Sequence, residues 1–423
     1  MKLYRKAILP IGFKANGMAS GIKKSGRLDL ALFYSDIPAK STCQFTANKI
    51  QAACIKINKR YLKNNGQFQA IIVNSGNANC FTGNFGLRDA EEITKSLAEV
   101  LGIKKEAILV SSTGIIGRRL PLSKIKDAIP DLVRSLSRQA IDKAKRAIMT
   151  TDTFTKEITV KFNIGNQIIT MCGIAKGAGM IAPNMACPEQ SRGSTSLTTI
   201  LSKRSASKDR GATMLCFLLT DAHITQRALI HALKTAVDKS FNCITVDGCM
   251  STNDSVIMLA NGASNNTLID INPVRNIAAK EGHSKISNGV NKNFDSFVKA
   301  LNIVCLELAK LIVKDAEGAT KFIQIKVKGA KSFQEAKKVA LSIANSNLFK
   351  TAMYGKNPNF GRIVASVGAS GIDIKERDLK IKVSPLNKRN INVDVSLNRG
   401  DSEAVVYTSD LTPEYIKINA EYN

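Results

Sequence analysis

Apolar positions in the first half of the chain gather in short runs that end in Gly- or Asn-rich turns, a pattern typical of strands. Residues 87–102 follow a different pattern, because their apolar side chains return every three or four positions. Leu97, Val100 and Leu101 share one face, so this segment is predicted to be an amphipathic helix. Gly102 marks its end. The predicted strands are residues 28–36, 53–57, 69–79 and 107–117.

Helical patterns continue further along the chain. Residues 122–152 extend the helical pattern, and Pro130 is expected to separate two helices there. A long amphipathic stretch at 294–318 predicts a helix that ends near Asp315, and residues 333–355 predict another. Strands and helices mixed in this way indicate a layered α/β protein, an α+β sandwich. Further strands are predicted at residues 320–330, 391–400 and 415–423.

Two polar tracts interrupt these patterns. Residues 187–211 hold five basic residues, two acidic residues and six serines, with little periodicity, so a solvated loop is expected. Residues 263–293 are rich in Asn, Ser and Lys and are expected to form a long surface connection.

The formal net charge of +27 raises the question of nucleic-acid binding. The basic residues are spread along the chain without a dense block, and aromatic residues make up only 5% of it. A specific nucleic-acid site would gather basic and aromatic side chains together. The distribution therefore favours a lysine-rich solvated surface, with nonspecific attraction to polyanions as the alternative.

Cysteine usage and hydropathy bear on the compartment. The nine cysteines are odd in number and include no C-x-x-C pair, which favours neither a disulfide framework nor a zinc site. The apolar runs fall short of the roughly 20 residues of a membrane helix. The N-terminal stretch also lacks the apolar segment of a signal peptide. We expect a cytoplasmic protein with no membrane contact, no metal and no bound cofactor.

Candidate chemistry is confined to small turns that carry Thr, Asn and Gly. The three histidines are not spaced for a Ser-His-Asp relay, and no P-loop or dinucleotide-binding fingerprint follows a strand. The stretch SSTGIIG at 111–117 follows an apolar strand, where a hydroxyl and a backbone N–H could hold an oxyanion. The TTDT stretch at 150–153 closes a helical segment and could equally be a simple hydroxyl-capped turn.

A further candidate lies at the junction of Ala212 and Thr213, just after the first polar tract. A Thr hydroxyl is a poor nucleophile unless a base lies close by. A Thr at the N-terminus of its own chain has such a base in its α-amine, whose ordinary pKa is about 7.7–8.0. Cleavage of the Ala212–Thr213 bond, through attack of the Thr hydroxyl on the preceding carbonyl, would create that terminus.

These features together resemble the ornithine acetyltransferase family, the glutamate N-acetyltransferases of arginine biosynthesis. The resemblance extends over nearly the whole chain. It implies a precursor that cuts itself before a Thr, a layered α/β fold and an α2β2 assembly. The motifs that carry it, in order, include GFKANGMASGIKKSGRLDLAL, NSGNANCFTG, SSTGIIG, IMTTDT, AKGAGMIAPNMA, ATMLCFLLTDA, SFNCITVDGCMSTND, DAEGATK and NPNFGRIVASVG.

By this resemblance, residues 1–212 form an α chain and residues 213–423 a β chain, with the cut between Ala212 and Thr213. Thr213 would be the nucleophile that takes acetyl from N2-acetylornithine and passes it to glutamate in a ping-pong cycle. The hydroxyl of Thr113 and the backbone N–H of Gly114 match the oxyanion hole of the family. Some members also accept acetyl-CoA as acetyl donor.

Four further positions match substrate-binding positions of the family: the position of Thr150 or Thr151, and those of Lys176, Glu317 and Asn419. Lys176 suits a substrate α-carboxylate, and Glu317 suits a substrate amine. On the residues alone, Lys176 would be interpreted as a surface lysine and Glu317 as a residue at a helix end.

The polar tract at 187–211 departs from the family pattern, in which PNMA runs directly into TML. If the tract leaves the local geometry intact, the chain cuts itself before Thr213. If it relaxes that geometry, Thr213 has no free amine. Three functions therefore stay open: an active acetyltransferase, an N-terminal-Thr amidohydrolase on the same scaffold, and an unprocessed remnant or basic polyanion-binding protein.

Overall fold

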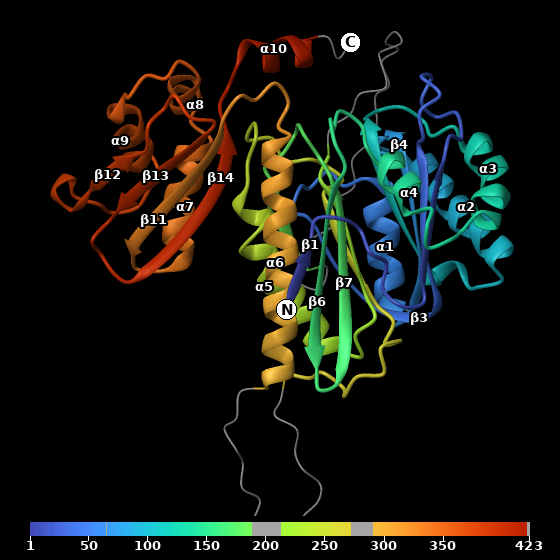
Figure 1. Ribbon diagram of the computed structural model, residues 1–423. Coiled ribbons are helices and arrows are strands. Elements are labelled where there is room, and N and C mark those ends of the chain that lie inside the picture. Colours follow the sequence, from blue (N-terminus) through green and yellow to red (C-terminus); the bar gives the residue numbers. More distant parts are fainter. Residues whose placement is uncertain (65, 188–212, 272–290, 421–423) are drawn as a thin grey trace, which may run out of the picture.

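The computed structural model describes residues 1–64, 66–187, 213–271 and 291–420 (Figure 1). Two sheets organise it, one of ten strands and one of four. Across these ranges, no helix is both long enough and apolar enough to cross a bilayer. The segments 188–211 and 272–290, which belong to the two polar tracts, lie outside the described residues, as does Ala212.

The larger sheet has the strand order β1–β6–β7–β9–β10–β3–β4–β5, and β2 and β8 also pair with β3. Its strands are β1 Lys2–Tyr4, β2 Phe13–Met18, β3 Leu30–Thr46, β4 Phe68–Asn77, β5 Ile108–Ile115, β6 Lys156–Ile164, β7 Gln167–Lys176, β8 Met185–Ala186, β9 Leu215–Thr220 and β10 Ser255–Ala260. The helices beside it are α1 Ala53–Asn64, α2 Gly83–Leu101, α3 Leu122–Arg134, α4 Ile141–Ala147, α5 Gln226–Asp238 and α6 Lys292–Lys314.

The central strand β9 shows why the molecule is layered. All six of its residues are buried, so both of its faces are covered. Leu215 and Phe217 face a core shared with β3–β5 and α1–α3, whereas Cys216 and Leu218 face a core shared with α5 and α6. Phe217 packs against Phe33 of β3 with the rings tilted by 30° and their centroids 5.1 Å apart. The predicted layered α/β architecture is confirmed.

The smaller sheet forms a second lobe, drawn at the left of Figure 1 in orange and red. Its order is β12–β13–β11–β14, and α7 packs on it across a separate apolar core. A backbone hydrogen bond from Thr245 N to Tyr407 O (3.0 Å) ties this lobe to the larger one. Its elements are β11 Phe322–Ala330, α7 Phe333–Ala344, α8 Asn347–Tyr354, α9 Phe360–Gly368, β12 Lys380–Val383, β13 Asn390–Ser396 and β14 Ser402–Ser409.

Two predicted strands are helices. Residues 53–57 begin α1, where Cys54, Ile57 and Tyr61 are buried on one helical face. Residues 415–420 belong to a helix, α10 (Pro413–Ala420), and 421–423 lie outside the described residues. Thr412 caps α10, because its hydroxyl oxygen accepts a hydrogen bond from Tyr415 N (3.2 Å). The other predicted strands are confirmed, and their ends differ by at most four residues except in β3, which was expected to end at 36 and continues to Thr46.

Three details of the helix predictions are wrong. Pro130 lies inside α3 on its exposed side, where water can bind the carbonyl that the missing N–H leaves unpaired. Residues 333–355 form two helices, since Ser346 starts α8 by accepting a hydrogen bond from Phe349 N (3.3 Å). Val100 is exposed, and the buried face of α2 runs through Ile93 and Leu97 instead. The helix expected to end near Asp315 is confirmed as α6.

Candidate active site

The register of the larger sheet places Thr213 among three chain segments. Leu215, the first residue of β9, pairs with Lys176 at the end of antiparallel β7 and with Ser255 at the start of parallel β10. Thr213, two residues before Leu215, therefore lies where β7 ends and β10 begins. It is only 1% exposed.

The end of β5 supplies the predicted oxyanion group. Thr113 and Gly114 are the strand's sixth and seventh residues, and both are buried. Gly114 has a φ of 138°, and a Cβ there would lie 2.2 Å from the backbone nitrogen of Asn77 on the neighbouring strand. Only glycine fits this close approach of β4 and β5. The local backbone that presents Thr113 thus depends on a residue without a side chain.

Lys176 joins this strand end to the turn after α4. Its Nζ donates hydrogen bonds to Thr113 Oγ1 (3.1 Å) and Thr150 Oγ1 (2.7 Å). The lysine is fully buried, so its interpretation as a surface lysine is wrong. Burial lowers the pKa of Lys176, and the nearby Asp152 carboxylate opposes that effect.

Lys176 lies next to a buried network of ion pairs formed by Asp152, Lys156 and Asp315. Asp152 Oδ1 accepts hydrogen bonds from Lys156 Nζ (2.6 Å) and from the backbone N–H of Gly177 (2.7 Å). Asp152 Oδ2 lies 3.9 Å from Lys176 Nζ, and Lys156 also donates to Asp315 (2.5 Å). Burial alone would raise the pKa of Asp152, but the two ammonium groups outweigh it and hold this pKa well below its usual range. The network fixes the position of the Lys176 ammonium.

Glu317 and Asn419 approach from the C-terminal side. Glu317 follows α6, and its backbone N–H donates to Ala178 O (3.0 Å), in the loop that starts at Lys176. Its carboxylate accepts a hydrogen bond from Asn419 Nδ2 (3.2 Å) on α10. A Cβ on Gly179 would lie 2.3 Å from that carboxylate, so a larger residue there would displace the Glu317 side chain. The two predicted substrate residues therefore meet over one loop.

The turn Ser251–Asp254 also contacts Thr213 and was not predicted as a site. Thr213 Oγ1 lies 2.9 Å from Ser251 Oγ, and Met214 N donates to Asp254 Oδ1 (3.0 Å). Asn253 Nδ2 donates to the carbonyl of Ser112 (2.8 Å), the residue before Thr113. Burial raises the pKa of Asp254 to about 7, against the lowering effect of backbone N–H groups. The segment SFNCITVDGCMSTND contributed to the family resemblance, yet nothing in it singles out these side chains.

The predicted residues are not all in mutual contact. Thr113, Thr150 and Lys176 are hydrogen-bonded together, and the register links them to Thr213. Thr151 Oγ1 is buried without a hydrogen-bond partner among the described residues. Of the two alternatives, Thr150 is the one that contacts Lys176.

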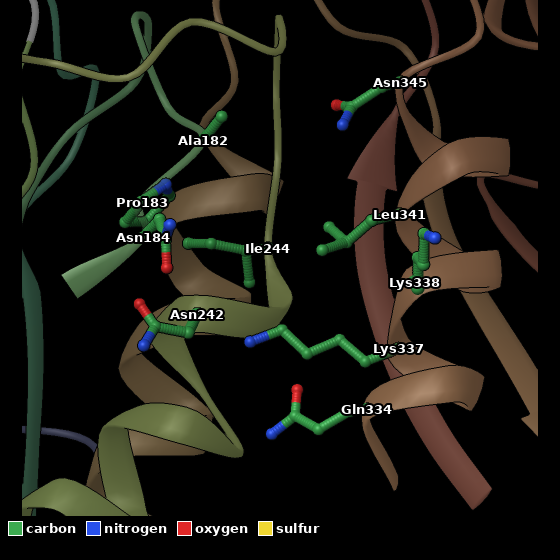
Figure 2. Close-up of a pocket in the computed structure, with 10 residues that line it drawn as sticks. All are labelled: Ala182, Pro183, Asn184, Asn242, Ile244, Gln334, Lys337, Lys338, Leu341 and Asn345. Atoms are coloured by element: carbon green, nitrogen blue, oxygen red, sulfur yellow. The ribbon is translucent and has the colours of Figure 1, made fainter. Parts of the chain in front are cut away.

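A separate cleft of about 460 Å³ lies between the two lobes. Figure 2 shows Lys337 reaching from α7 toward Asn242 on the opposite wall. None of the predicted site residues lines this cleft, so it is not the site of the Thr chemistry. Among the residues that the structure describes, no group of three or more His, Cys, Asp or Glu side chains could hold a metal ion.

Comparisons with a family model and with curated proteins agree on one family. The ArgJ family model matches residues 14–388 and 380–423. The arginine biosynthesis bifunctional protein ArgJ of Geobacter sulfurreducens is 41% identical over 432 residues, which cover 97% of this chain and 98% of that protein. The glutamate N-acetyltransferase of Methanocaldococcus jannaschii is 39% identical over 445 residues, covering 98% and 97% of the two chains.

One solved structure is also similar in sequence. Ornithine acetyltransferase from Mycobacterium tuberculosis, crystallised with ornithine, is 36% identical over 44% of this chain and 98% of its own, with a TM-score of 0.41.

Proposed function

The chain belongs to the ArgJ family, and on that premise we propose that it is an acetyltransferase of arginine biosynthesis that moves acetyl from N2-acetylornithine to glutamate. The observation that carries the proposal is the position of Thr213 beside the ends of β7 and β10, with Lys176 bridging from there to Thr113. This arrangement supports the proposal, because in it Thr213 would be the nucleophile, Thr113 and Gly114 the oxyanion-stabilising pair and Lys176 the cation for a carboxylate.

Self-cleavage comes first in this mechanism. The Thr213 hydroxyl oxygen attacks the carbonyl carbon of Ala212, and the C–N bond breaks to leave an ester and a free α-amine. Water then hydrolyses the ester, and residues 1–212 end in a carboxylate. Thr113 and Gly114 are the groups that would hold the oxyanion formed during the attack.

Acetyl transfer then uses the freed amine. The α-amine of Thr213 takes the proton of its own hydroxyl as the oxygen attacks the acetyl carbonyl of N2-acetylornithine. Collapse of the tetrahedral intermediate breaks the acetyl C–N bond, and the proton leaves with ornithine. Glutamate then attacks the acetyl-Thr213 ester through its own amine, which restores the free enzyme and forms N-acetylglutamate. This cycle needs no bound cofactor.

Substrate recognition rests on two oppositely charged groups. The buried ammonium of Lys176 pairs with the α-carboxylate that ornithine and glutamate share, helped by the Thr150 hydroxyl. The carboxylate of Glu317, held by Asn419, pairs with the side-chain amine of ornithine. Acetyl-CoA would serve as a second acetyl donor if the ester can also form from a thioester.

The proposal extends to the assembly and its location. The two chains form an α2β2 heterotetramer in the cytoplasm, where their amino-acid substrates are found. No disulfide joins any of the nine cysteines, all of which lie among the described residues, and a reducing compartment would maintain that state.

Intact mass under denaturing conditions, combined with an acetyl-transfer assay, tests the function. Two polypeptides, the second beginning Thr-Met-Leu, and glutamate-dependent release of ornithine are expected from the wild-type chain. Thr213→Ala should give one full-length polypeptide and no transfer. Release of acetate without glutamate would instead indicate an amidohydrolase. If the wild-type chain stays a single polypeptide and transfers no acetyl group, it is an unprocessed remnant. Salt-sensitive binding of nucleic acid would then support the hypothesis of a polyanion-binding protein.

A further inference from the structure

The Ser251–Asp254 turn holds a buried carboxyl group that the mechanism above does not use. Asp254 is fully buried, and its Oδ1 accepts the N–H of Met214 (3.0 Å). Its second oxygen, Oδ2, is buried and has no hydrogen-bond partner among the described residues. A buried carboxyl oxygen without a partner is costly, and such atoms are concentrated at functional sites.

The position of this carboxyl relates it to the nucleophile. Cleavage would free the backbone nitrogen of Thr213. Asp254 Oδ1 accepts a hydrogen bond from the backbone nitrogen of the next residue, Met214. Ser251, from the same turn, lies 2.9 Å from the Thr213 hydroxyl oxygen. The turn is itself anchored, because Asn253 Nδ2 donates to Ala78 O (2.7 Å) and Ser112 O (2.8 Å). This one turn thus contacts the Thr213 hydroxyl through Ser251 and the backbone N–H of the following residue through Asp254.

We propose that Asp254 is a positioning residue whose carboxylate receives the α-amine of the cleaved Thr213 and stabilises the ammonium ion formed when that amine takes the hydroxyl proton. This inference rests on the proposed function, because it needs a free Thr213 amine. The role corresponds to that of a carboxylate that orients a catalytic base and stabilises its protonated form.

The chemistry balances without a further reactant. The Thr213 Oγ–C bond forms as the hydroxyl proton moves to the α-amine, and Asp254 stays ionised beside the new ammonium. When the acetyl C–N bond breaks, the same proton passes to the departing amine of ornithine. Asp254 gains and loses no proton over the cycle.

Two other charged groups influence the ionisation of the Asp254 carboxyl, and that ionisation determines in which direction the pKa of the Thr213 α-amine changes. Lys176 from β7 favours the ionised form of Asp254, and Asp247 from the preceding loop disfavours it. An amine beside a carboxylate has a raised pKa, by about 1–3 units for a close pair. Replacement of Asp254 by Asn keeps an acceptor for Met214 but removes the charge. The pKa of the α-amine should then fall, and the acid limb of the rate profile should move to lower pH.

The test is single-turnover release of ornithine from N2-acetylornithine, measured from pH 5.5 to 9 with the cleaved enzyme. In Asp254→Asn, we expect the plateau rate to fall by about 10–100-fold and the acid limb to move down by about one unit. Asp221→Asn is the matched control. Asp221 is also a buried carboxyl that accepts two backbone N–H groups, from Thr170 (2.8 Å) and Ile11 (3.1 Å), but it lies beyond the far end of β9. Its profile should match that of the wild type.

Each outcome decides the matter. An Asp254→Asn profile that superimposes on the wild type, at a rate within twofold, overturns the proposal. If Asp254→Asn does not fold or does not cleave, Asp254→Glu replaces it, and the proposal then requires a displaced acid limb with a titratable group still present. Failure of both variants to give cleaved protein assigns Asp254 a structural role and overturns the inference. A wild-type chain that is uncut and inactive counts against the proposed function instead.

Discussion

At the scale of single residues, Lys176 stands out because its charged ammonium group is fully buried. Its ammonium is buried between the hydroxyls of Thr113 and Thr150 and the carboxylate of Asp152. A cation is kept there at a desolvation cost, which the Asp152 carboxylate offsets in part and which, under the proposed function, a substrate carboxylate would offset further.

We predict that Lys176→Met raises KM for both N2-acetylornithine and glutamate and lowers kcat/KM by about 30–1,000-fold, the range for loss of one partner of a buried charge pair. Steady-state kinetics for the two substrates measure it. Lys337→Met, in the cleft between the lobes, is the control and should leave both constants unchanged. An unaltered KM in the Lys176 variant would remove this lysine from the binding site.

Asp254 predicts a particular dependence of stability on pH. Burial raises the pKa of this carboxyl to about 7 in the folded chain, whereas an unfolded Asp titrates near 3.9. Between about pH 4 and pH 7 the folded state therefore binds more protons than the unfolded state, and stability falls as the pH rises. Above about pH 7 the penalty is constant, at about 4 kcal/mol.

Unfolding of an uncleavable chain measures this penalty without interference from the freed amine. In a Thr213→Ala background, Asp254→Asn should be the more stable protein at pH 8 by up to about 4 kcal/mol, and the advantage should vanish near pH 4. Urea unfolding at a series of pH values gives both curves. Parallel curves would mean that Asp254 is already ionised in the folded chain at pH 5.

At the scale of elements, the sequence predicted strands and helices correctly where the spacing of apolar residues repeats over a long enough segment. The strand β5 and the helix α6 were both predicted from such runs, whereas the strand β9 was not predicted. Residues 53–57 were misread because five apolar-rich residues fit either period, and only the later Ile57–Tyr61 spacing reveals the helix. The tail at 415–420 alternates like a strand, yet the Thr412 cap and the Pro413 start favour a helix.

The cap of α10 matters for function, because Asn419 reaches Glu317 from this helix. Thr412 Oγ1 accepts from Tyr415 N (3.2 Å) and donates to Gly318 O (2.7 Å), so it ties the helix to the Glu317 loop. We predict that Thr412→Ala raises KM for N2-acetylornithine severalfold while thermal unfolding of the rest of the protein changes little, since a lost cap costs about 1 kcal/mol. Steady-state kinetics measure the change in KM, and calorimetry measures the change in thermal unfolding. Asn419→Ala should reproduce the KM effect, and a changed kcat with constant KM would contradict this role.

At the scale of the whole molecule, the site is assembled from parts that are distant in sequence. The chemistry of Thr213, Thr113 and Gly114 was expected from motifs. The contact of Lys156 with Asp315, 159 positions apart, was not, because an ion pair across two elements leaves no local pattern. Ser251 was missed for the same reason, since its role arises only from the parallel pairing of β10 with β9. Sequence patterns carry the chemistry of a site, whereas its supporting contacts depend on tertiary packing.

The same sheet shows that the two predicted chains are interleaved. Strands β7 and β3 belong to residues 1–212, and between them lie β9 and β10 from residues 213–423. Each of the two large cores contains side chains from both segments. A cut at Ala212–Thr213 would remove one covalent bond but none of these contacts.

We therefore predict that the cleaved protein behaves as one folding unit. Its two polypeptides should coelute under native conditions, and loss of secondary structure in urea should coincide with chain separation in one transition, because β9 cannot leave without breaking its ladders to β7 and β10. Size exclusion and circular dichroism across a urea series measure both. Refolding of the cleaved protein should also slow as it is diluted, since the two chains must meet again, whereas uncleaved Thr213→Ala should refold at a rate independent of concentration. Native separation of the chains would contradict a shared core and would make the interleaved sheet a property of the precursor alone.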